Sequence, residues 1–429
     1  MSKNYDLKVK IEKINSKAEG EAVLTSHFQN KVFLSIPYTL PDELVSINVK
    51  KNYSSVSINE ILKFSADRKN HICSHFTKCG GCLLQHWDFQ KYTDWKFNLL
   101  FNPIRKISPS TIIKKMQIAK HYSRRRCKIF VRKIKSELFI GFKSYKSNQI
   151  INLTDCIILD REILNLIKKL FPLLRKNMLD REEMLIHINK LDAGFDVLLE
   201  IIKDYDFNDL NYFNSFCNSN NIVRLSIKQK DHKSELIGVF DKTSLTLSAN
   251  KIYMLPSPGG FFQATQFAEK VILDEIFLNI RKTNNLKILD LFSGSGTFSL
   301  PLLSFKHHVC SIDLNEDSII SLIKASKEQN IFNNLKTITQ NLKKDKLEIN
   351  FLKLFDLAIL DPPRSGAELL YIKIAEAKIP KIISISCDLN TFLKDSKILL
   401  KNSYKLKSVI PIDQFLFTRH LETIGIFEL

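Results

Sequence analysis

Apolar and polar positions alternate in the amino-terminal part of the chain. In LKVKIEKI the apolar residues Leu7, Val9 and Ile11 share one face, and VSINVKK repeats the pattern from Val45. Successive side chains of a strand point to opposite faces, so each segment has one apolar face to bury. Turn signals such as LPDE separate the segments. We therefore predict a small β-barrel, similar to an OB-fold, over residues 1–66.

Residues 67–262 mix strand and helix patterns. HYSRRRCKIFVRKI and ELFIGFKSYKSNQIINL are typical of strands, whereas DREILNLIKKLFPLLRKN has the apolar spacing of a helix, and further strand patterns continue to about residue 248. These patterns predict a central α+β domain.

From residue 263 onward, helical and strand segments alternate. The helical pattern TQFAEKVILDEIFLNI precedes the strand LKILDLF, and the strands HVCSID, LKTITQ, DLAILD and KIISIS follow, with helices between most of them. Strands that alternate with helices form a mostly parallel sheet covered on both faces. We predict a Rossmann-like α/β domain over residues 263–429.

Composition adds a charge argument to this picture. The 429 residues include 64 Lys and Arg against 45 Asp and Glu, a net charge of +19, which favours a polyanion such as nucleic acid as partner. An AT-rich genome, which inflates Lys, Asn and Ile, is an alternative source of the surplus. No apolar run is long enough to span a membrane and the first residues are polar, so we expect a cytoplasmic protein without a membrane partner, acting as a monomer.

The segment ILDLFSGSGTFSLPL joins an apolar strand to a helix through Gly294 and Gly296. Glycines at the carboxyl end of a strand let the backbone approach a nucleoside closely. A dinucleotide site requires a third glycine where this chain has Ser299, while Asp313, at the end of the next strand, can bind both ribose hydroxyls. The motif favours S-adenosylmethionine over NAD, and a plain strand-to-helix turn is the alternative.

Two further strands end in chemically interesting residues. In AILDPPRSG, the prolines after Asp361 fix the turn and hold this acid facing the ligand crevice. A plain helix-start acid is the alternative, because an acid before proline is common in turns. In KIISISCDLNTF, Cys387 follows the strand at the rim where open α/β sheets bind ligands, so it is placed to act as a nucleophile. A helix beginning near Asn390 would lower the pKa of its thiol, whereas Asp388 opposes thiolate formation. A small buried hydrophobic side chain is the alternative for Cys387.

The last segment, DQFLFTRHLETIGIFEL, places three polar side chains close together: Asp413, His420 and Glu422. Glu422 directly precedes an apolar run, and an acid at the start of a central strand usually has a partner or a role. A surface edge strand is the alternative.

Three cysteines in CSHFTKCGGCLLQHW, namely Cys73, Cys79 and Cys82, have C-x5-C-x2-C spacing, and Cys156 is the best remaining fourth ligand. Four thiolates suit an iron–sulfur cluster or zinc. Zinc ribbons usually contain two C-x2-C pairs, so the uneven spacing favours a 4Fe–4S cluster. The spacing also differs from the C-x3-C-x2-C of radical S-adenosylmethionine enzymes.

Taken in order, these motifs resemble the bacterial RNA uracil-5-methyltransferase family, and in particular its iron–sulfur 23S ribosomal RNA members that form 5-methyluridine. The likeness covers nearly the whole chain and is most specific in CSHFTKCGGCLLQH, GFFQATQ, DLFSGSGTFSL, LDPPRSG, SISCDLNTFLKD and DQFLFTRHLETI. It implies a TRAM domain at the amino terminus, a central iron–sulfur domain and a class I methyltransferase domain. The implied partner is RNA, most specifically 23S ribosomal RNA.

The resemblance also assigns roles to single residues. It implies that Cys387 is the nucleophile, Glu422 the base and Phe261 an aromatic residue that stacks on the uracil. Contacts to S-adenosylmethionine or to the flipped uracil are implied for Gln263, Phe292, Gly294, Gly296, Thr297, Asp313 and Asp361. The implied 4Fe–4S ligands are Cys73, Cys79, Cys82 and Cys156.

The chain departs from the family pattern at three points. Asn341 stands where the family usually has an acid near the adenine, Ser365 replaces a basic residue after DPPR, and SCDLNT differs from the commoner SCNP-x-T. These departures concern cofactor affinity, because the expected nucleophile and base are both present.

Two other functions remain open from the sequence. A transfer-RNA uracil methyltransferase is disfavoured by the cysteine cluster, and a noncatalytic RNA-binding or ribosome assembly factor is possible on the same fold. Three consecutive arginines, Arg124, Arg125 and Arg126, are expected either to contact phosphates or to lie on a solvated basic strand.

Overall fold

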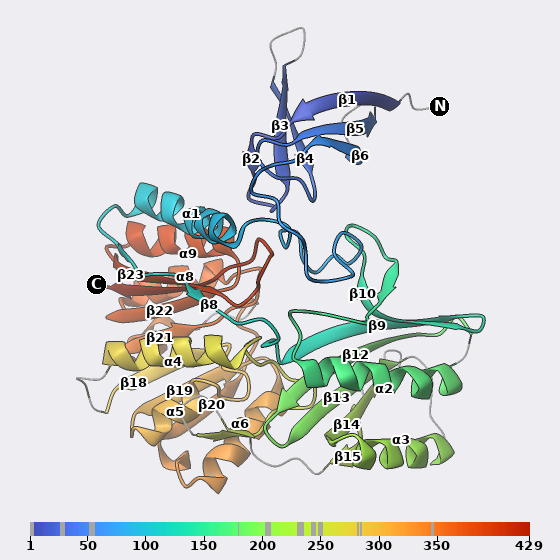
Figure 1. Ribbon diagram of the computed structural model, residues 1–429. Helices are drawn as coiled ribbons and strands as arrows, with labels where there is room; N and C mark the ends of the chain where they lie inside the picture. Colours follow the sequence, from blue (N-terminus) through green and yellow to red (C-terminus); the bar gives the residue numbers. More distant parts are fainter. Residues whose placement is uncertain are drawn as a thin grey trace. The chain divides into compact units, whose positions relative to one another are not determined.

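A computed structural model gives the fold of the chain (Figure 1). It describes residues 4–25, 31–50, 56–178, 180–201, 207–229, 236–241, 246–247, 252–280, 283, 285–344 and 347–429. Two compact units divide the chain: unit 1 comprises Met1–Asn102, Lys143–Ile151 and Phe415–Arg419, and unit 2 comprises Pro103–Phe142, Asn152–Gln414 and His420–Leu429.

Unit 1 contains two small antiparallel sheets that share one apolar core. The first has the strand order β1 (Asn4–Lys10), β5 (Leu44–Lys50) and β6 (Val56–Lys63), and the second the order β2 (Lys13–Ile14), β3 (Gly20–Thr25) and β4 (Lys31–Ile36). Alternate residues in these strands, and Ile11 directly after β1, are buried as the sequence pattern predicts. The buried core residues are Val9, Ile11, Ala22, Leu34, Ile36, Val45, Ile47 and Val49. Helix α1 (Phe89–Ile107) begins in this unit, and β11 (Ile150–Asn152) lies mostly within it.

A largely antiparallel sheet and two helices form the first part of unit 2. Its strands are neighbours in the order β10 (Glu137–Lys143), β9 (Arg126–Ile134), β12 (Glu183–Leu191), β13 (Gly194–Ile201), β14 (Ile222–Gln229) and β15 (Leu236–Asp241). Helices α2 (Arg161–Asn177) and α3 (Phe207–Ser219) belong to the same region (Figure 1). The predicted α+β pattern of strands and helices is therefore present here. A separate pair, β16 (Thr246–Leu247) and β17 (Tyr253–Met254), follows.

Among the described residues, nine strands form the second sheet of unit 2. Its order is β20 (Leu335–Thr339), β19 (His308–Asp313), β18 (Lys287–Leu291), β21 (Leu357–Leu360), β22 (Lys381–Ser386), β24 (Glu422–Glu428), β23 (Lys405–Asp413) and β7 (Ile112–Ile113), and β8 (Gln117–Ile118) also pairs with β23. The strands from β20 to β22 run parallel, and β24 runs antiparallel between β22 and β23.

Helices cover both faces of this sheet. One face packs through residues such as Ile288, Ile359 and Ile383 against α4 (Gln266–Ile280) and α5 (Ser299–Ser304). On the other face, Phe392 of α9 (Leu389–Lys401) packs against Phe427. The remaining helices are α6 (Glu316–Glu328), η1 (Phe332–Asn334), α7 (Ile349–Leu352) and α8 (Glu368–Ala377).

This arrangement confirms the predicted Rossmann-like class I methyltransferase fold with a small β-sheet region at the amino terminus. The domain boundaries at 66/67 and 262/263 stay predictions. No helix in the described ranges is both long and apolar enough to cross a membrane.

Candidate active site

The glycine turn after β18 leaves space beside its backbone. Gly294 has a φ of 54°, a conformation that favours glycine, and a Cβ built there would meet no atom within 4 Å. Its backbone N–H donates to Asp313 Oδ2 at 2.9 Å. Below the turn, buried Asp290 accepts a hydrogen bond from Ser299 Oγ at 2.5 Å, which ties the strand to the start of α5. The sequence therefore builds a rigid turn with an open side.

A cavity of about 300 Å³ lies beside this turn. Its lining includes Phe292, Asp313, Asn341 and Pro363. Each oxygen of the Asp313 carboxylate accepts one backbone N–H, from Gly294 or from Asn315, and keeps a second acceptor position. A carboxylate with spare acceptors, an aromatic wall and an open glycine turn suit a nucleoside with free ribose hydroxyls. The residues present therefore fit the adenosine part of S-adenosylmethionine.

Not every residue predicted to bind the cofactor lines this cavity. Gly296 packs near Leu322, and the Thr297 hydroxyl donates to the Met254 sulfur at 3.7 Å. Gln263 is also absent from the lining and belongs to a different set of contacts. The cavity thus brings together Phe292 and Asp313, while the roles of the other residues stay predictions.

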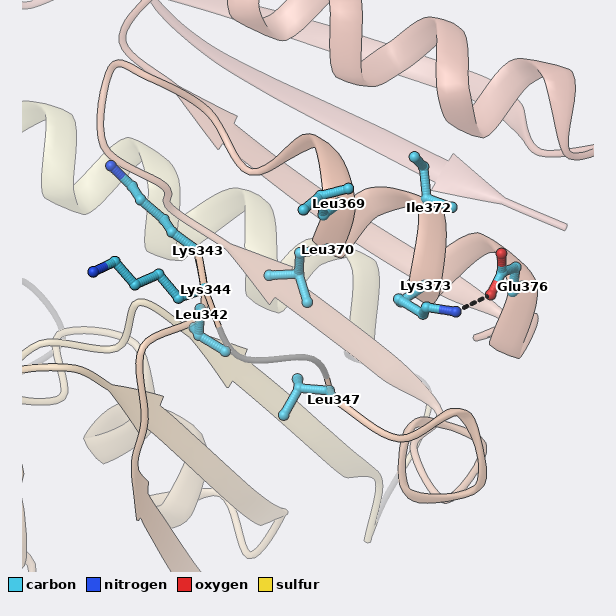
Figure 2. Close-up of a pocket in the computed structure, with 9 residues that line it drawn as sticks. All are labelled: Leu342, Lys343, Lys344, Leu347, Leu369, Leu370, Ile372, Lys373 and Glu376. Atoms are coloured by element: carbon cyan, nitrogen blue, oxygen red, sulfur yellow. Dashed lines mark hydrogen bonds and ion pairs between the residues drawn. The ribbon is translucent and has the colours of Figure 1, made fainter.

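A smaller cavity of about 150 Å³ adjoins the first and shares Leu342, Lys343 and Lys344 with it. Its other lining residues come mainly from α8, and Figure 2 shows Leu370 and Leu347 facing the space, with Lys373 paired to Glu376. At its edge, Lys343 Nζ lies 2.6 Å from Ser365 Oγ. A positive charge therefore stands beside Ser365, although the expected basic side chain is missing at that position.

The turn from Asp361 to Gly366 is held against the start of α9. Gly366 has a φ of 74°, and a Cβ there would come within 2.4 Å of Thr391 Cγ2. The Thr391 hydroxyl donates to the Arg364 carbonyl oxygen at 3.0 Å, and Asp388 caps the helix by accepting from Thr391 N at 3.1 Å. Asp388, which the sequence analysis treats as opposing thiolate formation, is thus the residue that starts the helix after Cys387.

Cys387 and Glu422 face one another across neighbouring strands. Ser386, the last residue of β22, pairs with Thr423 of β24. Cys387 follows Ser386 and Glu422 precedes Thr423, so both lie at the same edge of the sheet. Glu422 is 2% exposed and begins a central strand, which excludes the alternative of a surface edge strand. Cys387 is only partly buried. Asp361 directly follows β21, the neighbour of β22, at this edge.

The electrostatics of this cluster raise the pKa values of its thiol and of its two carboxyls. Burial raises the pKa of the Cys387 thiol to about 12, the charges of Glu422 and Asp361 add to the rise, and Arg364 opposes it through its charge and a hydrogen bond. Burial also raises the pKa of the Glu422 and Asp361 carboxyls well above their ordinary values, and Asp361 adds to the rise at Glu422. The predicted lowering of the thiol pKa by α9 is therefore outweighed.

Hydrogen bonds join Asp361 to Glu422 through two glutamines. Gln263 Nε2 donates to Asp361 Oδ2 at 2.8 Å, and Gln414 Nε2 lies 3.1 Å from Gln263 Oε1 and 2.7 Å from Glu422 Oε2. Both glutamines are buried, at 3% and 2% exposure. A polar set of this kind at a strand edge is organised for hydrogen bonding to a polar ligand.

The three arginines correct an expectation. Arg125 pairs with the buried carboxylate of Glu269 at 2.5 Å, and Arg126 stacks its guanidinium 4.4 Å from the centre of the Phe261 ring. Arg124 Nε donates to the Arg126 carbonyl oxygen at 3.0 Å. These side chains are half-buried with intramolecular partners, so a solvated basic strand is wrong. Phe261 itself is 57% exposed, which leaves ring surface for a stacking ligand.

The predicted cluster ligands Cys73, Cys79 and Cys82 lie in unit 1, and Cys156 belongs to unit 2. Within the described ranges, no group of three or more His, Cys, Asp or Glu side chains is arranged to hold a metal ion. The donor chemistry nevertheless suits a cluster, since Gly81 N–H donates to Cys79 Sγ at 3.4 Å, a type of contact that tunes cluster thiolates. The 4Fe–4S cluster stays a prediction.

Sequence reasoning missed two residues of the site, Gln414 and Arg364. Both carry a readable signal, because Gln414 directly follows a strand that ends in an acid, and Arg364 is the first cation after Asp361. What the sequence does not give is the pairing of β22 with β24, which brings these residues to one edge.

A family profile and two curated relatives that match this chain are all RNA methyltransferases. The family profile described as tRNA (Uracil-5-)-methyltransferase matches residues 98–428. A 23S rRNA (uracil(1939)-C(5))-methyltransferase of Shewanella sediminis is 28% identical and covers 100% of this chain and 97% of its own length. An RNA methyltransferase of Mesorhizobium japonicum is 27% identical over 92% of each chain.

Among solved structures, the Pyrococcus abyssi tRNA (uracil-54, C5)-methyltransferase, in complex with S-adenosyl-L-homocysteine, is similar to this chain in fold. The TM-score is 0.70 at 18% identity, over 98% of this chain and 100% of the other. The similarity therefore extends over the whole fold.

Proposed function

We propose that this chain, which belongs to the tRNA (uracil-5-)-methyltransferase family, methylates carbon 5 of a uridine, and that this uridine lies in 23S ribosomal RNA. Its activity is that of an S-adenosylmethionine-dependent RNA (uracil-5-)-methyltransferase. The observation that carries the proposal is the meeting of Cys387 and Glu422 across β22 and β24, beside Asp361. A thiol and a carboxyl at the same edge of neighbouring strands are the two groups that this reaction needs.

The chemistry of uracil explains both groups. Carbon 5 is too weak a nucleophile to react unaided, so the Cys387 thiolate adds to carbon 6 and forms an enolate whose carbon 5 accepts the methyl group. Glu422 then takes the proton from carbon 5, carbon 5 and carbon 6 regain their double bond, and the sulfur leaves as thiolate. Arg364, which hydrogen bonds to the Cys387 side chain, favours the charged form of the sulfur.

When bound, S-adenosylmethionine supplies the electrophilic methyl group. Phe292 and Asp313 would hold its adenosine in the 300 Å³ cavity, with Asn341 beside the adenine in place of the family's acid. Lys343, paired with Ser365, would supply positive charge near this pocket. Gln263 and Asp361 would read the polar edge of the uracil, and the exposed ring of Phe261 would stack on it.

The target base must leave its stack to reach Cys387, which costs about a few kcal/mol. The net charge of +19 supports binding of the RNA backbone, and the strands of unit 1 are a further RNA-binding element in our proposal. The Shewanella sediminis relative supports 23S rRNA as substrate. Transfer RNA is the second candidate, favoured by the family description and by the Pyrococcus abyssi neighbour.

One experiment tests the activity and the substrate together. RNA from a strain that lacks the gene is incubated with the purified protein and S-adenosylmethionine, and 5-methyluridine is mapped in ribosomal and transfer RNA. We expect new 5-methyluridine in 23S rRNA. Methylation of transfer RNA alone would overturn the substrate assignment, and no methylation of either RNA would favour a noncatalytic RNA-binding factor.

We also propose that Cys73, Cys79, Cys82 and Cys156 hold a 4Fe–4S cluster. The C-x5-C-x2-C spacing and the N–H donor at Cys79 support it. Bound iron and sulfide would link their segments covalently, which favours a role in folding or RNA docking.

Metal analysis tests this cluster. Protein purified without oxygen should be brown and contain about four irons per chain. Cys82→Ser should lose most of the iron, whereas Cys217→Ala, which changes a buried thiol outside the set, should keep it. Stoichiometric zinc in the anaerobic protein would refute the assignment.

A further inference from the structure

Gln414 occupies the centre of the hydrogen-bond set at the sheet edge. It follows the last residue of β23 and is 2% exposed. Its Nε2 group donates to Glu422 Oε2 at 2.7 Å and to Gln263 Oε1 at 3.1 Å, while its Oε1 accepts from the backbone N–H of Thr265 at 3.3 Å. Both N–H bonds of this amide are therefore used.

These partners allow only one orientation of the Gln414 amide. A flipped amide would place its oxygen against two acceptors, the Glu422 carboxylate and the Gln263 carbonyl, and its NH₂ group against the N–H of Thr265. A backbone N–H cannot reverse its polarity, so Thr265 fixes the direction of the whole set. Each of these buried groups would then lack a hydrogen bond, which is unfavourable.

The fixed amide determines what Gln263 presents. Its oxygen is turned to Gln414, so its Nε2 faces Asp361 and retains one N–H that Asp361 does not use. An N–H donor beside a carboxylate matches the O4 acceptor and N3–H donor of uracil. Cytosine has an amino donor and a ring-nitrogen acceptor at these positions, and both would meet a group of the same polarity.

The same amide determines which oxygen of Glu422 is available. Oε2 accepts from Gln414, whereas Oε1 is buried and has no hydrogen-bond partner among the described residues. A carboxylate with one oxygen anchored and the other unpaired presents a single proton acceptor in a defined direction. An unpaired buried oxygen is costly unless a ligand uses it.

We propose that Gln414 is a positioning residue that sets, through one amide, both the uracil preference at Gln263 and the direction of the Glu422 base. This inference rests on the proposed methyltransferase function and adds to it a residue that controls substrate choice. Gln414 acts through Gln263 and Glu422 and does not itself touch the reacting atoms.

The test compares Gln414→Met with Thr423→Val on RNA that carries the target uridine. Methionine has a similar length but donates no hydrogen bond, and Thr423 is a buried β24 residue whose hydroxyl has no partner among the described residues. We expect Gln414→Met to lower single-turnover methylation at saturating RNA by about tenfold or more, since hydrogen bonds to charged groups are among the stronger ones in proteins. Thr423→Val should retain the wild-type rate.

Three further readouts separate positioning from loss of structure. Gln414→Met should accumulate more SDS-stable protein–RNA adduct than Thr423→Val, because proton removal by Glu422 follows bond formation by Cys387. It should also bind RNA with cytidine at the target position with less discrimination than the wild type. Finally, the acidic limb of its rate–pH profile should move to higher pH, since Glu422 loses a donor while Asp361 and Arg364 still face it.

The outcomes distinguish this inference from the proposed function. Equal rates, adduct levels, base discrimination and pH profiles in the two variants would overturn the role of Gln414. Failure of the wild-type protein to methylate any RNA would overturn the proposed function itself.

Discussion

Cys387→Ala should abolish methylation. Alanine removes the sulfur that bonds to carbon 6 but leaves the backbone and the helix cap at Asp388 unchanged. Without this bond carbon 5 has no enolate to attack the methyl group, so we expect kcat to fall by about 10⁴-fold or more. The measurement is transfer of labelled methyl groups to the target RNA.

Cys310→Ala is the matched control, because Cys310 is a buried thiol in the same sheet, on β19. It should keep most of the activity. Binding of RNA by Cys387→Ala should remain close to that of the wild-type protein, because the substitution leaves the charged surface unchanged. Methylation at the normal rate in Cys387→Ala would contradict the covalent mechanism.

The order of strands and helices could be predicted well from periodicity. Apolar runs ending in an acid or a cysteine identify β18, β19, β21 and β22, and the helical spacing of TQFAEKVILDEIFLNI matches α4. Each of these patterns lies within one short segment, so it can be recognised from the sequence alone. The division into compact units is not local, because segments far apart in the chain, such as Lys143–Ile151 and Phe415–Arg419, join unit 1.

The residues of the candidate site could be predicted better from the sequence than the effect of their surroundings on their pKa values. Glu422 and Cys387 stand at strand ends, and the structure brings them to one edge. The helix after Cys387 predicts a lowered thiol pKa, but burial and two carboxylates outweigh the helix and raise this pKa. Such a balance depends on side chains from β21, β22 and β24 together, and no single motif contains it.

The arginines show the same limit. A basic run is visible in the sequence, but its partners are Glu269 on α4 and the ring of Phe261, both more than a hundred residues away along the chain. Composition gives the number of basic side chains but does not show which groups they contact. Phe261, by contrast, keeps an exposed ring beside Arg126, which suits the stacking role implied by its motif.

Glu422→Gln should trap the RNA on the protein. The amide keeps the shape of Glu422 and an oxygen that can accept from Gln414, but it cannot take a proton from carbon 5. Addition of Cys387 and methyl transfer still proceed, so the product remains bonded to sulfur. We expect turnover to fall by about 10²–10⁴-fold and an SDS-stable protein–RNA band to build up in the presence of S-adenosylmethionine.

The dependence of that band on the Cys387 sulfur shows whether Cys387 forms the covalent bond to the RNA. In the double variant with Cys387→Ala the band should vanish, because its only covalent link is the bond from sulfur to carbon 6. Mass spectrometry of the trapped species should find methylated uridine on the peptide that contains Cys387. A band that persists without the sulfur would show that another side chain bonds to the RNA. Normal turnover in Glu422→Gln would show that another residue removes the proton.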